Sequence, residues 1–402
     1  MKTVAILGLG YVGFPLAELL AKSKKYKVMG LDIKRLKSTL FAATTDFSQI
    51  KKADISVVCV PTPVYKNYQP DYRPLKNACM SIAKNLKKGQ LVIIESTINP
   101  GTCEEVVSPI LERYGAVTGK DFLLSHCPER IDPGNKKWTL VNIPRNIGGI
   151  DERSASQAAA FYRSFLKGKV KILNSIKAAE ATKIVENTFR DINIAYVNEL
   201  AMSFDKLGID ILEVIEGAKT KPFAFMPHYP GAGVGGHCIP VDPYYLIERA
   251  LHSGFEHRFL EMARKVNNDM PAYTVSLLEN EAEKLKLPLK KITIGLLGLA
   301  YKKDIADIRE SPSLQILKIL KSKRLKIEIF DPFLPAKSTV KDLKTFVKKC
   351  DAVILATNHS VFEKNLVNML KGSSVKIFID GRNCMSKDKI TELKIAYKGI
   401  GH

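Results

Sequence analysis

Short apolar runs alternate with amphipathic segments along the first third of the chain. The runs are nearly continuous, as expected for parallel strands buried on both faces, and the segments between them keep helical spacing. This alternation predicts a doubly wound α/β domain. The predicted strands are Thr3–Leu7, Lys27–Leu31, Ile55–Val60, Leu91–Glu95, Phe122–Ser125 and Val170–Leu173, and the predicted helices are Phe14–Ala21, Leu75–Leu86, Cys103–Tyr114 and about Asp151–Leu166.

The middle of the chain changes to helical spacing without breakers. Apolar residues recur at helical intervals from about Ile176 to Leu207, a length that predicts a helix connecting two domains. A second helical block runs from Asp242 to about Leu285. Pro271 lies inside this block and predicts a kink or a short break, because proline has no N–H to donate.

The last third returns to alternation, which predicts a second, smaller parallel α/β domain. The fold class is therefore α/β, with two Rossmann-like, doubly wound parallel-sheet domains joined by a long central helix and a helical domain. We expect the boundaries at residues 1–175, 176–287 and 288–402. The strands predicted in the last part are Lys291–Leu297, Lys326–Phe330, Ala352–Ala356 and Val375–Asp380.

The net charge of +21 is the unusual feature of the composition of these 402 residues. A charge this positive is typical of proteins that bind nucleic acid, so a nucleic-acid-binding protein is one functional alternative. The basic runs, however, are scattered, consist mainly of lysine and lack interleaved aromatic residues, so we expect no nucleic-acid partner. No apolar run is long enough to span a membrane, and the N-terminus resembles no signal peptide. Seven sparse cysteines favour a reducing compartment, and we expect a cytoplasmic protein without metal.

A glycine motif, Gly8-Leu9-Gly10-Tyr11-Val12-Gly13, follows the first strand and opens a helix. Its glycines allow a tight turn and a close approach to a pyrophosphate. Asp32 ends the second strand, where a carboxylate accepts the ribose hydroxyls of NAD and disfavours NADP. Lys34 and Arg35 follow closely and could relax that preference. The alternative is a glycine-rich turn that binds no ligand.

Two threonines follow the ends of later strands. Thr62 lies in Pro61-Thr62-Pro63 and Thr97 in Glu95-Ser96-Thr97. Ligands of open α/β sheets bind beyond the carboxyl ends of strands, so either residue could contact the cofactor. A role as a helix cap or turn residue is equally open.

Cys238 lies in an unusual glycine-rich segment that runs from Gly231 to Asp242. Pro240 and Asp242 are predicted to open a helix, and a thiolate near a helix start is stabilised by the helix dipole. Most cysteines are small core hydrophobes, and we interpret Cys59, Cys79 and Cys350 in this way. The neighbours of Cys238 cannot form a packed helix or strand, which favours a nucleophile.

Two further groups of polar residues have weaker signals. Lys183, Asn187 and Arg190 share one face of the long helix and could point into a cleft, although a solvated face is the commoner explanation. Gly298–Asp304 and Arg309–Pro312 follow a strand and lead into a helix, which predicts a second anion site. Lysines there could equally be surface charge.

The chain as a whole resembles the UDP-glucose/GDP-mannose dehydrogenase family, the nucleotide-sugar 6-dehydrogenases. The resemblance covers nearly the whole chain and keeps the motifs in the family's order. The matching segments are Gly8–Pro15, Val60–Pro63, Glu95–Thr102, Cys127–Arg130, Lys183–Asn187, Gly233–Asp242, Gly298–Asp304, Arg309–Pro312 and Asp331-Pro332.

This resemblance implies oxidation of a sugar CH₂OH to a carboxylate with two NAD, through a thiohemiacetal and a thioester on Cys238. It implies that Lys183 is a general base or oxyanion partner and that Asn187 lies beside it. It also implies that Thr97 and Glu129 position water and that Asp242 assists the thiol. The expected cofactor residues are Gly8, Gly10, Tyr11, Val12, Gly13, Asp32, Thr62, Thr97 and Arg309, and the expected substrate residues are Glu129, Arg130, Lys183, Asn187, Arg190, Tyr229, Gly235, Tyr301, Lys302 and Arg382.

The segments Gly236–Tyr245 and Phe255–Pro271 are similar to the UDP-N-acetylhexosamine branch of the family. We expect UDP-N-acetylglucosamine as the substrate, UDP-N-acetylmannosamine next, and UDP-glucose as a further alternative. Family members are commonly dimers or larger, so we expect at least a homodimer. The segment between Asp32 and Ile55 is shorter than in typical members, which implies altered loop contacts. A simple two-electron hydroxyacid dehydrogenase is disfavoured by Cys238 and by the second α/β domain.

Overall fold

The computed structural model describes residues 1–65, 67–131, 135 and 137–402. Contacts divide the chain into two compact units. One comprises Met1–Glu186 and Tyr244–Glu256, and the other Asn187–Pro243 and His257–His402. The long helix α5 (Ile176–Leu207) contributes residues to both units, as a connecting helix should. The three-part division predicted along the sequence stays a prediction.

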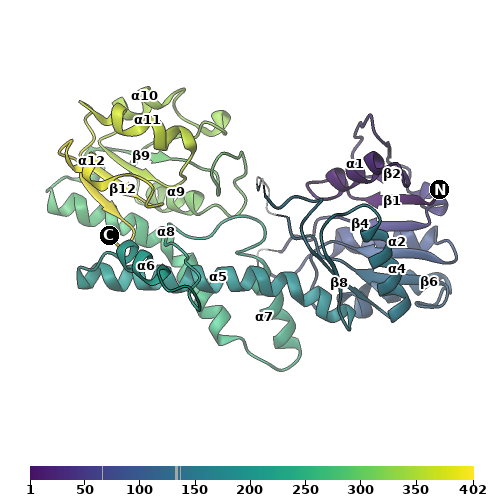
Figure 1. The fold of residues 1–402 in the computed structure, drawn as a ribbon. Helices are drawn as coiled ribbons and strands as arrows, with labels where there is room; N and C mark the ends of the chain where they lie inside the picture. The colour runs from purple at the N-terminus through teal and green to yellow at the C-terminus, as the bar shows by residue number, and fades with distance from the viewer. Residues whose placement is uncertain (66, 132–134, 136) are drawn as a thin grey trace. The chain divides into compact units, whose positions relative to one another are not determined.

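The described part of the first unit contains an eight-stranded sheet in the order β3-β2-β1-β4-β5-β6-β7-β8 (Figure 1). Neighbouring strands are parallel except for β6 and β7, which are antiparallel. Six strands match predicted runs, whereas β3 and β7 were not predicted. The bounds are β1 Thr3–Leu7, β2 Lys27–Leu31, β3 Ala42–Thr44, β4 Ile55–Val58, β5 Gln90–Ile94, β6 Phe122–His126, β7 Arg145–Gly149 and β8 Val170–Ile172.

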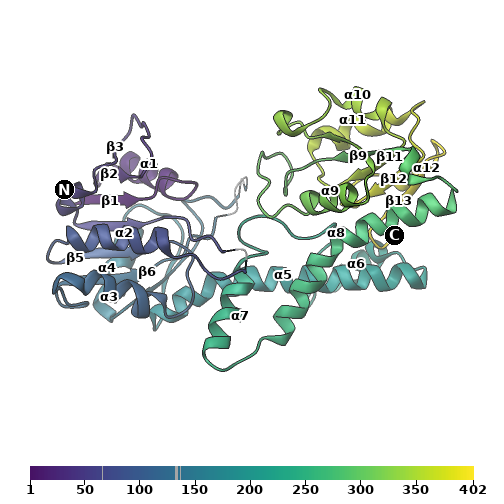
Figure 2. The ribbon, with the colours of Figure 1, turned by 180° about the vertical axis from the view of Figure 1, so that it is seen from behind.

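Helices cover both faces of this sheet because alternate strand residues point in opposite directions (Figures 1 and 2). Val4 and Ile6 pack in the same cluster as residues of α1 and α4. Ala5 and Leu7 pack in the opposite cluster, with α2 and the helical segment 103–114. The bounds are α1 Gly13–Ser23, α2 Arg73–Lys84, a π-helical turn at Cys103–Val107, α3 Ser108–Leu111, a 3₁₀ turn at Glu112–Tyr114 and α4 Glu152–Arg163.

The second helical block is divided at a different place from the one predicted. It forms α7 (Asp242–His252) and α8 (Arg258–Lys284), and α8 continues through Pro271. The connection lies at residues 253–257, where Gly254 has a left-handed φ of 82°. Pro271 cannot donate to the Asn267 carbonyl four residues earlier. That carbonyl lies against Gly233 instead, at 3.2 Å from the position of a Cβ there.

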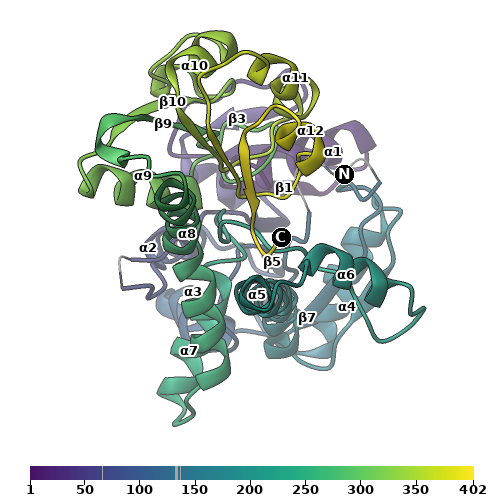
Figure 3. The same cartoon turned by 90° about the vertical axis from the view of Figure 1, so that its left-hand side faces the viewer.

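The described part of the second unit contains a five-stranded parallel sheet in the order β10-β9-β11-β12-β13. Helices α8 and α9 pack on one face, and α10, α11 and α12 pack on the other (Figure 3). This confirms the predicted second parallel domain, although β13 was not predicted. The bounds are β9 Thr293–Leu297, β10 Lys326–Phe330, β11 Ala352–Leu355, β12 Ile377–Asp380, β13 Ala396–Gly399, α6 Ile211–Lys219, α9 Pro312–Ser322, α10 Leu343–Lys349, α11 Ser360–Leu370 and α12 Lys387–Thr391. Within the described ranges, no helix has the length and apolar character needed to cross a bilayer.

Candidate functional site

The glycine motif joins β1 to α1 and leaves one side of the turn open. Gly8 has a φ of 89°, and a Cβ there would lie 2.9 Å from the carbonyl of Cys59. A Cβ on Gly13 would lie 1.9 Å from the Gly8 oxygen. Gly10, by contrast, has nothing within 4 Å of a Cβ position. Gly8 and Gly13 therefore close the turn, while Gly10 leaves room for a phosphate to approach. Tyr11 is exposed at this turn and Val12 is half-buried.

Asp32 ties the end of β2 to this turn. Its Oδ2 accepts the Leu9 N–H at 2.8 Å and its Oδ1 accepts the Lys34 N–H at 2.9 Å. A carboxylate has about four acceptor positions, and the side chain is only half-buried, so Asp32 can still accept ribose hydroxyls. Lys34 and Arg35 are exposed directly after it. These residues fit NAD at this edge of the sheet.

Thr62 and Thr97 follow β4 and β5, which are neighbours in the sheet. Thr62 is 4% exposed, and its carbonyl accepts the Tyr245 hydroxyl at 2.6 Å. Thr97 is half-buried. Both lie at the carboxyl edge of the sheet, as predicted, and Tyr245 is a contact that the sequence did not indicate.

Glu180 on α5 fixes the loop that carries Thr97. Its two carboxylate oxygens accept the Gly101 N–H at 2.5 Å and the Cys103 N–H at 2.7 Å. Burial raises the pKa of Glu180 to about 7, although the two N–H groups oppose the shift. Lys183 lies three residues further along the same helix. Sequence reasoning missed Glu180, although its spacing from Lys183 places both on one helix face.

A buried charge cluster, formed by Glu95, Glu129, Arg145 and Tyr162, lies beneath this edge. Arg145 Nη2 is 2.6 Å from Glu129 Oε2, and Arg145 Nη1 is 3.8 Å from Glu95 Oε2. The Tyr162 hydroxyl donates to Glu95, and the Arg145 guanidinium lies 5.6 Å from the centre of the Tyr162 ring. The structure thus places Glu129, predicted to position water, in contact with an arginine that sequence reasoning missed.

Lys183 influences two buried groups near this cluster. Burial and, second to it, the charge of Lys183 lower the pKa of His126 to about 3. The same charge opposes the burial that raises the pKa of Glu95 to about 7. Lys183 is half-buried. Arg130, expected to bind substrate, pairs with Glu186 at 2.9 Å through its Nε.

In the second unit, the segment that carries Cys238 is held by close backbone contacts. A Cβ on Gly235 or Gly236 would lie 2.7 Å from side-chain atoms of Tyr301. The Gly236 N–H donates to the Arg309 carbonyl at 3.0 Å. Only glycine permits this approach, which brings the segment against the predicted substrate residue Tyr301.

Cys238 lies in the turn that leads into α7, which begins at Asp242. Its carbonyl accepts the Asp242 N–H at 2.8 Å, and its side chain is exposed, unlike those of Cys59, Cys79 and Cys350. Asp242 is buried and accepts the Asn187 amide at 2.6 Å. The structure therefore brings three predicted catalytic residues into one part of this unit.

Arg382 is fixed at the carboxyl edge of the second sheet. Its Nε donates to the Ala356 carbonyl at 2.9 Å and its Nη2 to the Tyr301 carbonyl at 3.2 Å. A Cβ on Gly231 would lie 3.4 Å from its Nη1. Lys302, next to Tyr301, is half-buried. Together these residues form a cationic edge suited to a nucleotide diphosphate.

The second sheet has an aspartate, Asp331, at the position that corresponds to Asp32 of the first sheet, but its carboxylate is buried. Asp331 follows β10, and its Oδ2 accepts the N–H groups of Leu299 at 2.7 Å and Ala300 at 3.0 Å. The same oxygen lies 3.2 Å from His359 Nε2. Asp331 and His359 are fully buried, so this carboxylate is not available to a ribose.

Three other predicted residues lie on exposed parts of the second unit. Arg309 is exposed, and its Nε lies 3.0 Å from both carboxylate oxygens of Asp307. The exposed Tyr229 donates to Glu216 at 2.6 Å, on α6. Arg190 is exposed on α5. Their predicted contacts with ligand stay predictions.

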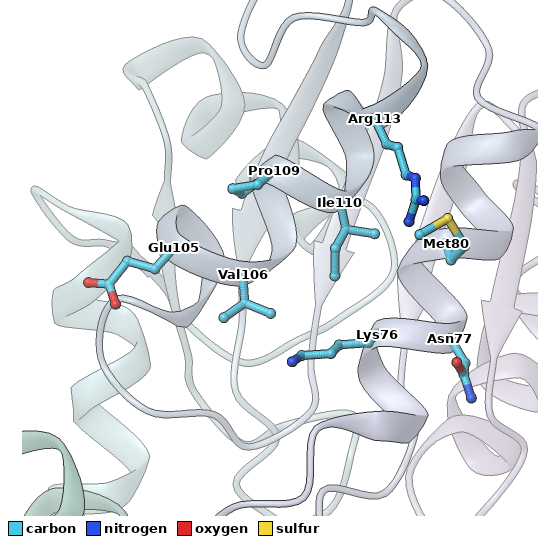
Figure 4. A pocket seen from close by; sticks show the side chains of 8 residues that line it. All are labelled: Lys76, Asn77, Met80, Glu105, Val106, Pro109, Ile110 and Arg113. Carbon is cyan, nitrogen blue, oxygen red and sulfur yellow. The ribbon is translucent and has the colours of Figure 1, made fainter.

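A groove of about 450 Å³ lies outside the predicted site, between α2 and residues 105–113 (Figure 4). Its floor is largely apolar, and its cations, Lys76 and Arg113, come from the two sides. None of the predicted residues lines it. The lining residues are Lys76, Asn77, Met80, Glu105, Val106, Pro109, Ile110 and Arg113.

Comparison with known proteins gives consistent matches along the chain. Residues 34–166 match the NAD binding domain of the UDP-glucose/GDP-mannose dehydrogenase family, residues 177–269 its central domain and residues 295–387 its UDP binding domain. A UDP-N-acetyl-D-mannosamine dehydrogenase of Pyrococcus horikoshii is 36% identical over 99% of each chain. A UDP-N-acetyl-D-glucosamine 6-dehydrogenase of Pseudomonas aeruginosa is 36% identical over 96% of this chain and 98% of its own. The solved structure of a Pyrococcus horikoshii UDP-D-ManNAc dehydrogenase superposes with a TM-score of 0.91 at 35% identity, covering 100% and 99% of the two chains.

Proposed function

Because this chain belongs to the UDP-glucose/GDP-mannose dehydrogenase family, we propose that it oxidises C6 of a UDP-N-acetylhexosamine to the carboxylate. The expected substrate is UDP-N-acetylglucosamine, with the mannosamine epimer as the alternative. The observation that carries the proposal is the exposed thiol of Cys238, on a glycine segment packed against Tyr301 and followed by the Asp242–Asn187 pair. Relatives that act on each epimer are equally similar to this chain.

The thiol explains how one enzyme performs two oxidations. When bound, NAD supplies the acceptor for the hydrides, so that one CH₂OH group, two NAD⁺ and one water give a carboxylate, two NADH and three protons. Cys238 adds to the C6 aldehyde and holds it as a thiohemiacetal, whose oxidation gives a thioester. Water then cleaves the C–S bond and returns the thiol. In this proposal Lys183 is the oxyanion partner or, in its neutral form, the general base for the first hydroxyl proton. The Asn187 amide donates to Asp242, which follows the thiol segment.

The product count tests this function. UDP-N-acetylglucosamine, UDP-N-acetylmannosamine and UDP-glucose are each incubated with NAD, and NADH and uronate are counted per sugar consumed. We expect two NADH per sugar, and the highest kcat/KM for UDP-N-acetylglucosamine. Cys238→Ala should lower uronate formation by at least about 1000-fold. One NADH per sugar, or full activity of Cys238→Ala, would contradict the proposal, and a preference for the mannosamine substrate would correct the epimer.

We also propose that the chain acts as a cytoplasmic homodimer, supplying a uronate for polysaccharide synthesis. Support for the dimer comes from large apolar side chains exposed on α5, α6 and the following segment of the second unit. A soluble monomer rarely exposes so many near one another. They include Phe189 (46% exposed), Tyr196 (56%), Val214 (40%), Phe223 (67%) and Met226 (63%).

A further inference from the structure

The buried charge cluster of the first unit requires an explanation beyond folding. Glu95, Glu129 and Arg145 are at most 3% exposed. Moving three ionisable side chains out of water has a desolvation cost that apolar residues of similar size would avoid. A cluster of this kind is therefore weak evidence for stability, and its value must lie in what it holds in place.

Glu129 is held at both of its oxygens, in two different ways. Oε1 accepts the N–H groups of Arg130 at 2.6 Å and Ile131 at 2.7 Å. Oε2 lies 2.6 Å from Arg145 Nη2 as an ion pair. This oxygen is buried, yet it accepts no hydrogen bond from any residue that the structure describes. The Arg145 guanidinium therefore fixes the orientation of Oε2, to which no other described residue donates a hydrogen bond.

The other members of the cluster hold Arg145. Glu95 is the second, more distant carboxylate, and Tyr162 both donates to Glu95 and lies under the guanidinium. The thiol of Cys59 also approaches Glu95 Oε2, at 3.9 Å. The guanidinium is thus restrained by an aromatic face and by two carboxylates on neighbouring strand ends. A planar side chain suits this arrangement better than a lysine ammonium would.

We propose that Arg145 is a positioning residue that orients Glu129 so that Oε2 receives the water that hydrolyses the thioester. This rests on the proposed function. The water oxygen attacks the thioester carbonyl carbon while its proton passes to Glu129. The C–S bond then breaks, the electron pair leaves with Cys238 as a thiolate, and the product is the carboxylic acid. Arg145 touches neither sugar nor water in this step.

Arg145→Lys tests the proposal because it keeps the charge but cannot span both carboxylates. We expect a rapid first phase of about two NADH per Cys238, as in the wild type, followed by steady turnover about 10- to 100-fold slower. The thioester should then accumulate, and intact-protein mass spectrometry after rapid acid quenching should show a sugar adduct that Cys238→Ala lacks. Arg163→Lys, an exposed arginine on α4, is the matched control and should give neither effect.

A purely structural role for Arg145 predicts a different outcome. The first phase and the steady rate would fall together with the folded fraction, and no adduct would appear. That result would overturn the proposal. If Arg145→Lys does not fold, Tyr162→Phe replaces it, because it keeps the ring under the guanidinium and loses only the donor to Glu95; we expect a smaller accumulation of the same adduct, and its absence would equally overturn the proposal. Failure of the proposed function is distinguishable, since the wild type itself would then release no NADH.

Discussion

At the scale of single residues, the glycines of the turn after β1 have two different roles: two allow close packing and one leaves space for a ligand. Gly8 and Gly13 are enclosed by backbone atoms, whereas Gly10 faces open space. A side chain at an enclosed position must displace the fold, while one at the open position meets only a ligand. This difference separates the effects of substitution on stability from those on binding.

Gly13→Ala and Gly10→Ala should therefore behave differently. In Gly13→Ala the Cβ would lie 1.9 Å from the Gly8 oxygen, and we expect unfolding to become easier by about 1–3 kcal/mol. Gly10→Ala should keep its free energy of unfolding within about 0.5 kcal/mol of the wild type and still bind NADH about tenfold more weakly. Urea unfolding and NADH fluorescence titration measure the two quantities. Gly217→Ala, also without neighbours at its Cβ, is the control and should leave NADH binding unchanged. Loss of stability in Gly10→Ala would show that the turn is not open there.

Sequence reasoning identified the residues with unusual local surroundings and missed those with unusual distant partners. Cys238 was recognised because no packed element accommodates its glycine neighbours. Arg145 and Glu180 were missed because their partners belong to other elements. Arg145 begins β7, whereas Glu129 follows β6. The Gly101 and Cys103 amides lie 79 and 77 residues before Glu180. A single sequence carries little signal for such pairings.

At the scale of elements, Glu180 in the N-terminal part of α5 caps the start of the helical segment that begins at Cys103. Glu180 accepts two backbone N–H groups at the N-terminal end of the segment that begins at Cys103. Such groups lack partners within their own helix, so Glu180 replaces partners that a local cap would otherwise provide. This contact also joins the loop of Thr97 to the helix of Lys183.

Glu180→Gln should change how stability depends on pH. Burial raises the pKa of Glu180 from 4.5 to about 7, so the folded chain keeps a proton that the unfolded chain releases. The contribution of this carboxyl to stability therefore falls as pH rises from about 4.5 to 7. Relative to Glu180→Gln, the wild type should lose roughly 1–3 kcal/mol over that window. Urea unfolding at pH 4.5 and pH 8 measures it, with the exposed Glu152→Gln as control. A constant difference between wild type and Glu180→Gln would refute the prediction.

Elements whose side chains follow a simple pattern were predicted, and the others were not. β7 was missed because it begins with Arg145 and ends with two glycines, which breaks the apolar run. β13 is short and only alternately buried. The break expected at Pro271 is absent because packing holds α8 together there, with Met270 and Pro271 buried. Long-range packing overrides local preference in each case.

At the scale of the whole molecule, the charge of +21 has a limited meaning. Only a few cations lie at the predicted nucleotide sites, and most of the others are exposed lysines. They can attract a doubly charged nucleotide sugar, an effect that salt weakens. The exposed apolar side chains of α5 are the more informative surface feature.

The double variant Phe189→Asp/Tyr196→Asp tests the assembly. The two residues lie seven positions apart on α5 and share a face. If this face pairs with a second copy, four buried carboxylates would oppose association, and we expect the dimer dissociation constant to rise by at least about 100-fold. Sedimentation equilibrium measures it. Leu285→Asp, at an exposed position after α8, is the control and should remain dimeric. A wild type that sediments as a fully active monomer would contradict the prediction.

The two aspartates that follow equivalent strands have a consequence for how the enzyme distinguishes its two nucleotides. Asp32 keeps acceptor positions open. Asp331 is fully buried, with Leu299, Ala300 and His359 at its Oδ2 and the Phe333 N–H at its Oδ1. In a protein with two similar sheets, the cofactor could bind at the substrate's sheet, or the substrate at the cofactor's, because both ligands are nucleotides. In the second sheet the protein's own hydrogen bonds occupy this acid, so we expect it not to bind a ribose. We therefore expect the second sheet not to bind the adenosine ribose of NAD, which leaves its edge for the nucleotide of the substrate.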